Sequence, residues 1–408
     1  MKCGLLGGKL GHSYSPQIHG MLGSYSYDLF EVSEHELEHF LKHGDFTGLN
    51  VTIPYKKAVI PFCAELSVRA EQLGAVNTIL RRSNGSLIGH NTDYFGFASM
   101  LERTGLKVAG KKVLVLGSGG ASNTVVAVLR EAGAQVVVIS RSGEDNYRNL
   151  HRHADAGVLV NTTPVGTFPN TGISPVDLRL FPALEGVLDV VYNPARTQLL
   201  LDAENRGLVT ENGLWMLVAQ AKESAEWFTG RNISDSVIPE IHRALRRKME
   251  NIILVGMPGS GKTTIGKLLA AELNKQFADA DAQVEAMAGC TIPDIFAQAG
   301  EEHFRSLETQ ALKALGMQSG LVLATGGGCV TRERNYPLLH QNGTIVWLKR
   351  DTALLPTEGR PLSQQGRLEQ MYAQRKSLYA RFADITADNC GSPEQTVQTI
   401  LAKLEESK

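Results

Sequence analysis

Two glycine-rich loops in this sequence have the residue types and spacing to hold phosphate groups. The residues at 256–263 read GMPGSGKT and fit the pattern G-x-x-x-x-G-K-[ST]. In that pattern backbone N–H groups surround phosphate oxygens, the lysine reaches the β- and γ-phosphates, and the hydroxyl binds Mg²⁺. We therefore expect a nucleoside triphosphate here, with Lys262 on the phosphates and Thr263 on the metal ion.

The other glycine-rich loop, GSGGAS at 117–122, follows an apolar run and precedes a helical pattern, although Ser122 replaces a third glycine. Such a loop can bring backbone N–H groups and a helix N-terminus against a pyrophosphate. The next predicted strand ends on Ser140 and Arg141, where an Asp or Glu would bind the ribose of NAD. A guanidinium suits a 2′-phosphate, which favours NADP over NAD. A loop that binds nothing and a solvated Arg141 are the alternatives.

Polar side chains also gather in predicted loops upstream of residue 95. Hydroxyls, amides and a lysine–carboxylate pair are what a polyhydroxylated carboxylate needs from its binding site. A lysine beside a carboxylate can protonate the oxygen that develops charge as a ketone receives hydride. Taken singly, Lys56 is more typical of a solvated loop lysine and Ser13 of a turn residue or N-cap, but their occurrence together favours a binding site. The polar loop residues are Ser13, Ser15, Asn50, Thr52, Lys56, Asn77 and Asp93.

The phosphate loop at 256–263 does not by itself identify a phosphate acceptor. Asp279 and Asp281 lie at the end of a predicted strand. A first carboxylate there can support a metal ion, and a second can take a proton from a hydroxyl. The alternative for a bare Asp-x-Asp is a solvated turn.

The elements that must position these residues belong to an α/β chain. Strand–glycine loop–helix units begin at about 112 and 251, and a helix with a basic end is predicted over 234–249. We therefore place the main domain boundary at 247–250, after an N-terminal α/β domain and a dinucleotide-type domain that meet near residue 95. Further buried strands, of the kind found in parallel sheets, are predicted at 48–53, 135–139, 157–161, 186–192, 321–324 and 344–348.

Length and composition narrow the class of protein. A chain of 408 residues exceeds the size of one hydrophobic core, so two or more domains are expected. Lys+Arg 41 against Asp+Glu 42 gives no electrostatic reason for a nucleic acid or anionic membrane partner. Five scattered cysteines form no C-x-x-C pair, and no apolar stretch approaches a bilayer span, so we expect the reducing cytoplasm. Small-molecule chemistry is the class that these observations favour.

The first part of the chain resembles the shikimate dehydrogenases over nearly all of 1–248. The motifs, in family order, are GHSYSPQIH, GLNVTIPYK, GAVNT, GHNTDYFG, VLGSGGAS, NTTPVG, DVVYNPARTQLL and NGLWMLVAQA. The resemblance implies NADPH-linked reduction of 3-dehydroshikimate, with Lys56 and Asp93 as the catalytic pair. It implies substrate contacts from Ser13, Ser15, Thr52, Asn77, Asp93, Tyr192 and Gln220. It implies NADP contacts from Gly117, Ser118, Gly119, Gly120, Ala121, Ser140, Arg141 and Gly213.

Three positions depart from the dehydrogenase pattern. Gly20 replaces the usual Asn, Tyr55 occupies a variable position before Lys56, and Thr167 replaces the usual Met after NTTPVG. The Thr167 change removes a flexible apolar wall from the nicotinamide pocket that the resemblance implies. None of the three changes the lysine, the aspartate or the serines.

The second part resembles the shikimate kinases over 251 to about 390, through GEEHFRSLE, ATGGGCV, GRPL and QRKSLYARFAD. The resemblance implies that Arg305 and Arg375 bind the shikimate carboxylate and that Asp281 engages the reacting hydroxyl. The resemblance also implies that Arg360, on a lid, stabilises the transferring charge. The lid departs from the family, because Leu354-Leu355-Pro356-Thr357-Glu358-Gly359 lacks the usual adenine-contacting arginine. The remaining implied contacts are Gly327 and Gly328 for the substrate; Gly256, Gly259, Ser260, Gly261, Lys262, Thr263 and Thr264 for ATP; and Thr263 and Asp279 for the metal.

Both resemblances point to one metabolite, because the product of the first reaction is the substrate of the second. They predict a substrate-binding domain at 1–95, a Rossmann-type NADP domain at 96–212 and a P-loop shikimate kinase domain with a parallel sheet at 249–408. They also predict that a C-terminal helix of the dehydrogenase, at about 213–248, packs back on the first domain. The expected cofactors are NADP(H), ATP and Mg²⁺, and the expected partners are 3-dehydroshikimate and shikimate, with no nucleic acid or membrane. The sequence does not indicate an oligomeric state.

Two alternative functions stay open at this stage. In the first alternative, the first half of the chain is a quinate-type dehydrogenase that uses NAD. In the second alternative, one half of the chain is a catalytically silent binding module. Arg141, in place of an acidic residue at the end of the predicted strand, argues against the first. The second is opposed by the presence of Lys56, Asp93, Lys262, Asp281, Arg305 and Arg375.

Overall fold

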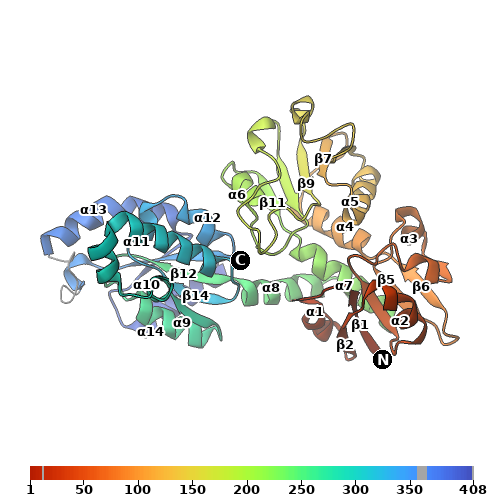
Figure 1. The fold of residues 1–408 in the computed structure, drawn as a ribbon, viewed down its shortest axis with the longest axis horizontal. Coiled ribbons are helices and arrows are strands. Elements are labelled where there is room, and N and C mark those ends of the chain that lie inside the picture. The colour runs from red at the N-terminus through yellow and green to blue at the C-terminus, as the bar shows by residue number, and fades with distance from the viewer. Residues whose placement is uncertain (12, 356–364, 407–408) are drawn as a thin grey trace. The chain divides into compact units, whose positions relative to one another are not determined.

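The computed structural model describes residues 1–408 except 12, 356–364 and 407–408. The chain forms two compact units: unit 1 comprises Met1–Thr167, Ile173–Tyr192 and Leu199–Ala244, and unit 2 comprises Phe168–Gly172, Asn193–Gln198 and Leu245–Lys408. Unit 1 holds a six-stranded and a five-stranded sheet, and unit 2 holds a second five-stranded sheet (Figure 1). Among the described residues, no helix has the length and hydropathy that a bilayer crossing requires.

The first sheet is mixed, with strand order β2-β1-β3-β5-β6-β4. Strand β1 pairs in parallel with β2 and β3, whereas β5 runs antiparallel to both β3 and β6. The prediction of a parallel strand at 48–53 is therefore wrong for one of its two edges, because β5 and β6 form a hairpin beside it. The elements are β1 Lys2–Gly7, α1 Ser15–Leu22, β2 Ser26–Glu31, η1 Glu34–Glu36, α2 Leu37–His43, β3 Gly48–Val51, η2 Ile60–Phe62, β4 Glu65–Leu66, α3 Val68–Leu73, β5 Thr78–Arg81 and β6 Leu87–His90.

The second sheet is entirely parallel, with order β11-β10-β9-β7-β8. Its strand β10 ends at Asp189, three residues before the predicted end, because the buried Asp189 carboxylate accepts the Val191 N–H at 3.0 Å. The elements are α4 Asp93–Thr104, β7 Lys112–Leu116, α5 Gly120–Glu131, β8 Gln135–Ile139, η3 Leu150–His153, β9 Val158–Asn161, η4 Leu178–Leu180, β10 Gly186–Asp189, α6 Gln198–Glu204, β11 Val209–Glu211 and α7 Leu214–Thr229.

Helix α7 contacts elements that precede and follow residue 93. It packs against α1 and β5, which precede residue 93, and most extensively against α4, which begins at that residue. The approach to α4 is close at Gly96, where an added Cβ would lie 2.7 Å from the Met216 carbonyl oxygen. A side chain at 96 would therefore push the two helices apart, so the glycine permits this packing.

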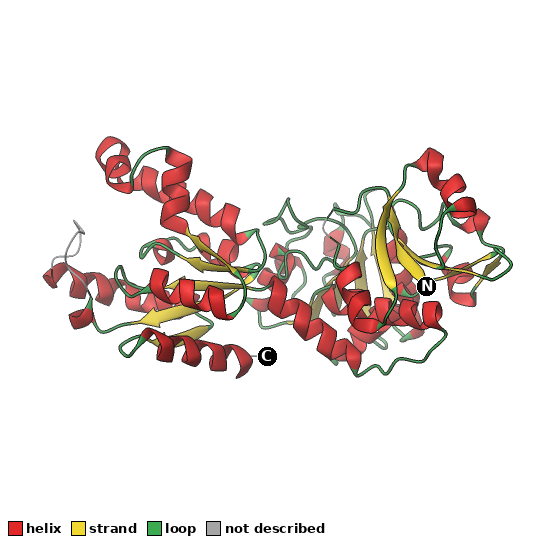
Figure 2. Cartoon of the chain, turned by 90° about the horizontal axis from the view of Figure 1, so that it is seen from below, coloured by secondary structure: helices red, strands yellow, loops and turns green. Residues whose placement is uncertain are grey.

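Unit 2 contains a parallel sheet with order β13-β14-β12-β15-β16, and helices cover both of its faces (Figure 2). This is the fold class that the sequence predicts for this part of the chain. The elements are α8 Val237–Met249, which begins in unit 1, then β12 Asn251–Val255, α9 Lys262–Glu272, β13 Gln276–Asp279, α10 Ala280–Ala288, α11 Ile292–Gly316, β14 Leu321–Ala324, η5 Cys329–Thr331, α12 Asn335–His340, β15 Gly343–Lys349, η6 Thr352–Leu354, α13 Gln365–Phe382, β16 Ile385–Asp388 and α14 Pro393–Glu406.

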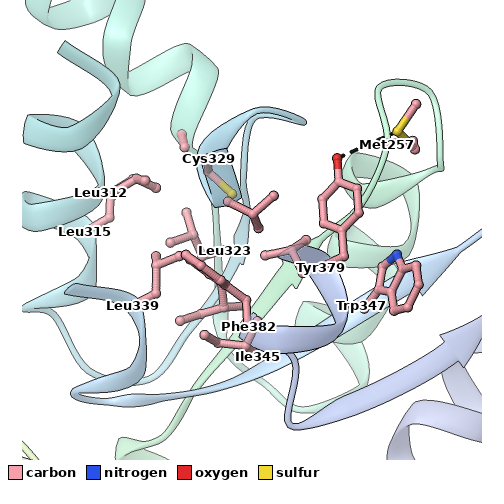
Figure 3. Packing of buried hydrophobic residues seen from close by; sticks show 14 of the residues in the cluster. Met257, Leu312, Leu315, Leu323, Cys329, Leu339, Ile345, Trp347, Tyr379 and Phe382 are labelled. Carbon is pink, nitrogen blue, oxygen red and sulfur yellow. Dashed lines mark hydrogen bonds between the residues drawn. The ribbon is translucent and has the colours of Figure 1, made fainter. Parts of the chain in front are cut away.

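A buried apolar cluster of unit 2 packs against Met257 of the phosphate loop. Trp347 on β15 stacks on Tyr379 of α13 with ring centroids 5.8 Å apart, and the Tyr379 hydroxyl reaches the sulfur of Met257 at 3.8 Å (Figure 3). Leu323 and Phe382 complete the packing around these rings. The second residue of the phosphate loop is thereby anchored in the core.

Candidate active sites

The lysine and aspartate of the first constellation form an ion pair in unit 1. Lys56 lies in the loop after β3, and Asp93 is the first residue of α4. Lys56 Nζ is 2.6 Å from Asp93 Oδ2, with 23% and 11% of the two side chains exposed. The N-terminus of α4 favours a negative carboxylate at this position. Asp93 thus holds the Lys56 ammonium group in a position that is still partly accessible to a ligand.

A buried network of amides and hydroxyls fixes the turn that carries Asp93. Asn77 Oδ1 accepts the Thr92 N–H at 2.7 Å, and Asn77 Nδ2 donates to Thr92 Oγ1 at 3.0 Å. Thr92 Oγ1 also lies 3.0 Å from Ser224 Oγ on α7, and Asn50 Nδ2 donates to Ser224 Oγ at 2.7 Å. Tyr27 donates its hydroxyl hydrogen to Asn50 Oδ1 at 2.7 Å. All these side chains are held before any ligand arrives.

The other predicted substrate contacts lie at the start of α1, after β3, after β10 and on α7. Ser15 begins α1, and its N–H donates to Ser13 Oγ at 3.2 Å. Thr92 Oγ1 donates to Gln220 Oε1 at 3.4 Å, which joins α7 to the same turn. Tyr192 follows β10 at the edge of the Tyr14 ring, and burial raises its pKa. Within the described residues, no hydrogen bond joins Ser13, Ser15 or Tyr192 to Lys56 or Asp93.

The glycine loop of unit 1 connects β7 to α5. Gly117 has φ 107, a region that favours glycine, and an added Cβ would lie 2.8 Å from Thr162 Oγ1. Ser122 Oγ donates to the Gly117 carbonyl oxygen at 2.7 Å. The serine that replaces the third glycine therefore closes the loop on itself. Gly119 is exposed, and Gly120 opens the helix, so backbone N–H groups remain accessible.

The residues predicted to select the cofactor lie at the same sheet edge. Leu116 pairs with Ile139, so the ends of β7 and β8 are level, and Ser140 and Arg141 follow directly. Arg141 is exposed. Gly213 precedes α7, and an added Cβ there would overlap the Val190 carbonyl oxygen. Any side chain at Gly213 would displace this backbone.

The phosphate loop of unit 2 runs from the end of β12 to α9. Gly256, Gly259 and Gly261 all have positive φ. Lys262 is 8% exposed, and its Nζ donates to the carbonyl oxygens of Gly256 at 2.9 Å and Met257 at 3.0 Å. The lysine therefore lies over the loop, where phosphate oxygens would meet it. The other predicted ATP residues, Ser260, Thr263 and Thr264, belong to the same loop and the first turn of α9.

The predicted metal-binding pair is close together. Thr263 Oγ1 donates to Asp279 Oδ2 at 3.1 Å. Asp279 also caps α10, because its Oδ1 accepts the Asp281 N–H at 3.0 Å. Mg²⁺ prefers such hard oxygen ligands and uses one or two protein groups together with phosphates. The two side chains fit that pattern, and the described residues contain no cluster of three or more His, Cys, Asp or Glu suited to a metal ion.

The predicted acceptor residues form a buried charged cluster beside β14. Burial raises the pKa of Asp281, and the negative Asp279 adds to that shift, while Lys262 and Arg305 oppose it. Arg305 Nη1 lies 2.9 Å from Glu308 Oε2, and the Glu308 side chain is 0% exposed. Burial also raises the pKa of Glu308, against the opposing effect of Arg305.

A glycine turn after β14 lies against this cluster. A Cβ on Gly326 would lie 2.6 Å from Glu308 Oε1, and one on Gly328 would overlap the Arg305 guanidinium. Arg375 Nη1, from α13, donates to the Gly327 carbonyl oxygen at 3.1 Å. The structure thus brings both predicted arginines to one turn.

The structure describes only the first two residues of the altered lid stretch, Leu354 and Leu355. Leu354 ends η6 and is exposed, whereas Leu355 is buried. Arg360 and the remainder of the altered stretch, 356–359, lie outside the described residues.

Sequence reasoning missed several members of these clusters. Glu308 lies within the GEEHFRSLE motif, where its spacing of three from Arg305 was the available signal. Thr92 lies in NTDYFG, next to the predicted Asp93. Ser224 is one of several small polar residues in a helical stretch, and nothing local distinguishes it.

Comparison with known proteins identifies both parts of the chain. The family model described as "Shikimate dehydrogenase substrate binding domain" matches residues 5–79, and the model described as "Shikimate kinase" matches residues 258–405. Shikimate dehydrogenase (NADP(+)) from Clostridium perfringens strain 13 is 37% identical over 265 residues, which cover 60% of this chain and 97% of that protein.

Solved structures give the same result for the first part. Shikimate dehydrogenase 1 from Peptoclostridium difficile is similar with 36% identity and a TM-score of 0.56, covering 60% of this chain and 97% of that one. Shikimate 5-dehydrogenase from Thermus thermophilus, solved in complex with NADP(H) and shikimate, has 33% identity and a TM-score of 0.55, covering 60% and 99%.

Proposed function

The chain belongs to the shikimate dehydrogenase family and also carries a shikimate kinase domain, and on that premise we propose which two reactions it catalyses. Unit 1 reduces 3-dehydroshikimate to shikimate with NADPH. Unit 2 phosphorylates shikimate with ATP to give shikimate 3-phosphate. The single observation that carries the proposal is the presence of reactive groups in both units, Lys56 with Asp93 in unit 1 and Lys262 with Asp281 in unit 2.

In the proposed reduction, NADPH supplies a hydride to the ketone carbon. The Lys56 ammonium group donates a proton to the ketone oxygen, which would otherwise become an alkoxide. Asp93, 2.6 Å from the ammonium nitrogen, holds it in place and accepts a hydrogen bond from a substrate hydroxyl. The hydroxyl and amide groups of Ser13, Ser15, Thr52, Asn77, Tyr192 and Gln220 bind the carboxylate and the remaining hydroxyls.

Cofactor choice rests on Arg141. Relatives of this chain carry NADP in their names, which supports NADP as the cofactor. We propose that the exposed guanidinium at the end of β8 binds the 2′-phosphate, while the loop of Gly117, Ser118, Gly119, Gly120 and Ala121 faces the pyrophosphate. Ser140 and Gly213 complete the site. The open alternative, an NAD-linked quinate dehydrogenase, predicts a preference for NADH over NADPH.

In the proposed phosphorylation, Asp281 accepts a hydrogen bond from the reacting hydroxyl and takes its proton as the oxygen–phosphorus bond to the γ-phosphate forms and the bond between that phosphate and ADP breaks. The raised pKa of Asp281 brings it closer to that task than an ordinary carboxylate. Arg305 and Arg375 bind the shikimate carboxylate, with Gly327 and Gly328 against the ring. Lys262 neutralises the phosphates. Thr263 and Asp279 would hold Mg²⁺, which would neutralise charge on the phosphate oxygens.

One assay with separable arms tests this function. The purified chain receives 3-dehydroshikimate, NADPH, ATP and Mg²⁺, and mass spectrometry follows shikimate and shikimate 3-phosphate. Without ATP, shikimate should accumulate; with added shikimate and no NADPH, shikimate 3-phosphate should form. Failure of either arm makes that half a silent module. Quinate oxidation with NAD at a rate that exceeds shikimate oxidation with NADP would replace the first assignment.

The cysteines bear on the cellular compartment of the protein. All five cysteines are free thiols in the described structure. We propose a reducing compartment, the cytoplasm, where such thiols persist. Fractionation of cells with an antibody against the chain tests it.

A further inference from the structure

We infer that Arg350 binds the α-phosphate of the nucleotide, a role that rests on the proposed ATP site of unit 2. Arg350 is the first residue after β15 and belongs to none of the motifs that identify the phosphate loop or the acceptor cluster. Its position, its lack of a partner and the direction of the sheet each contribute to this assignment.

The position of Arg350 is beside the phosphate loop. Val255 at the end of β12 pairs with Trp347 of β15, so the two strands end at the same edge of the sheet. A Cβ added to Gly261 would lie 4.0 Å from Arg350 Nη1 and 2.7 Å from the side-chain nitrogen of Asn389. The guanidinium therefore lies beside the last glycine of the loop, immediately before Lys262.

Arg350 has no anionic partner among the described residues. Its Nε is buried without a hydrogen bond, and no described carboxylate lies within ion-pair distance of the guanidinium. Two nearby carboxylates engage backbone groups instead: Asp351 accepts the Ala353 N–H at 3.0 Å, and Asp388 accepts the Cys390 N–H at 2.9 Å. A buried guanidinium donor without an acceptor is costly, and it suits a ligand that brings an anion.

The charges around the loop indicate the kind of anion. Lys262 and the N-terminus of α9 already place positive charge there. A guanidinium without an anionic partner beside this positive charge is unfavourable unless a multiply charged anion binds there. A nucleoside polyphosphate is such a group, and a guanidinium binds phosphate oxygens through charge-assisted hydrogen bonds.

The order of the strands identifies which phosphate Arg350 meets. Strand β12, which carries the loop, has β14 on one side and β15 on the other. The acceptor cluster of Asp281, Arg305 and Glu308 lies beside the glycine turn after β14. The γ-phosphate must face that side, because it is transferred there, so the α-phosphate lies toward β15 and Arg350.

The test measures binding of ADP and of inorganic tripolyphosphate to the full chain carrying Arg350→Ala or Arg350→Lys. Loss of a charge-assisted bond should weaken both ligands by about tenfold or more in Arg350→Ala. Arg350→Lys should recover part of the loss, because it keeps the charge but not the planar fork. The Michaelis constant for ATP should rise, and that for shikimate should stay within about twofold of wild type.

The matched control is Arg381→Ala, which removes an equal charge from an exposed arginine of α13 that pairs with Glu333. It should leave ADP binding unchanged. Unchanged ADP affinity in Arg350→Ala, or an equal loss in Arg381→Ala, overturns the inference. Weaker ADP binding with unaltered tripolyphosphate binding also overturns it, since Arg350 would then contact the nucleoside. Wild-type chain that binds ADP without phosphorylating shikimate would refute the proposed function, and the ADP comparison would still decide the role of Arg350.

Discussion

Removing Arg305 should damage unit 2 in two separable ways. In the wild type, Arg305 Nη1 lies 2.9 Å from Glu308 Oε2, and the Glu308 side chain is 0% exposed. Glu301, also paired with Arg305, is 66% exposed and contributes little. Breaking a buried pair by removing one partner costs about 3–5 kcal/mol, because the remaining charge has no compensation. Arg305→Ala should therefore destabilise unit 2 by about that amount and also weaken shikimate binding at least about tenfold.

Hydrogen exchange of the intact protein measures the stability loss. Amides of the buried strands β12 and β14 should exchange about 10²- to 10⁴-fold faster in Arg305→Ala, since 1.36 kcal/mol is a factor of ten. Strands β7 and β9 of unit 1 serve as the internal reference and should exchange as in wild type. Unchanged exchange in β14 would refute the argument from the buried pair.

The pH dependence of this effect has a definite sign. Burial already raises the pKa of Glu308, and Arg305 opposes that shift, so the variant raises the folded-state pKa further. A group whose folded-state pKa lies above its unfolded value gives stability that is lost as the pH rises through the folded-state pKa. The stability deficit of Arg305→Ala should shrink as the pH falls from about 7.5 toward the unfolded glutamate value of about 4.3.

A double variant separates stability from binding. Arg305→Met with Glu308→Leu removes both charges and fills the space with apolar side chains, a replacement that is often neutral or stabilising. Exchange in β14 should return to within about tenfold of wild type, whereas shikimate binding should stay weak. Recovery of shikimate affinity in the double variant would refute Arg305 as a ligand of the carboxylate.

The remaining predictions concern single reactive groups. Lys56→Ala should lower NADPH oxidation by about 10²–10⁴-fold while phosphorylation of added shikimate persists; parallel loss of both activities would indicate misfolding instead. Arg141→Ala should raise the Michaelis constant for NADPH far more than that for NADH, and an equal effect on both would remove Arg141 from the 2′-phosphate site. Lys262→Ala should abolish phosphoryl transfer and leave reductase kinetics unchanged, as coupled assays on the same preparation would show. Gly326→Ala should impair phosphorylation at saturating ATP, because the new Cβ would lie 2.6 Å from Glu308 Oε1, and a normal rate would argue against that packing.

The sequence predicted best what is encoded within a few consecutive residues. The loop ending in Lys262 and Thr263 combines a strand, positive-φ glycines and a helix start, so local pattern alone specifies its geometry. The α/β class followed from the same units. The mixed first sheet was not predictable, because the pairing of β3 with β5 depends on a hairpin that forms later in the chain.

The parts of the sites that sequence reasoning missed depend on distant contacts. Asn389 donates to the Ser260 carbonyl oxygen at 2.7 Å across 129 positions of sequence, and Ser224 reaches Asn50 across 174. Such residues have no local pattern that distinguishes them from solvated Asn or Ser. Their roles become visible only when burial and partners are known.

The network behind Lys56 has a consequence for interpreting kinetics. Asn50, Asn77, Thr92 and Ser224 hold the turn of Asp93 with amide and hydroxyl groups, none of which changes charge over the working range of an enzyme. At the far end of the network burial raises the pKa of Tyr27 well above its ordinary value.

His19, which contacts Tyr27 of this network, also keeps one charge state. His19 stacks on Tyr27 with ring centroids 4.0 Å apart, and burial lowers its pKa to about 3, so it stays neutral. The amide and hydroxyl groups that hold the Asp93 turn, and His19 beside them, are therefore an uncharged frame whose hydrogen bonds do not depend on proton concentration. Ionisations seen in a rate profile of the reductase can then be assigned to the groups that the frame holds and to the ligands, instead of to the frame.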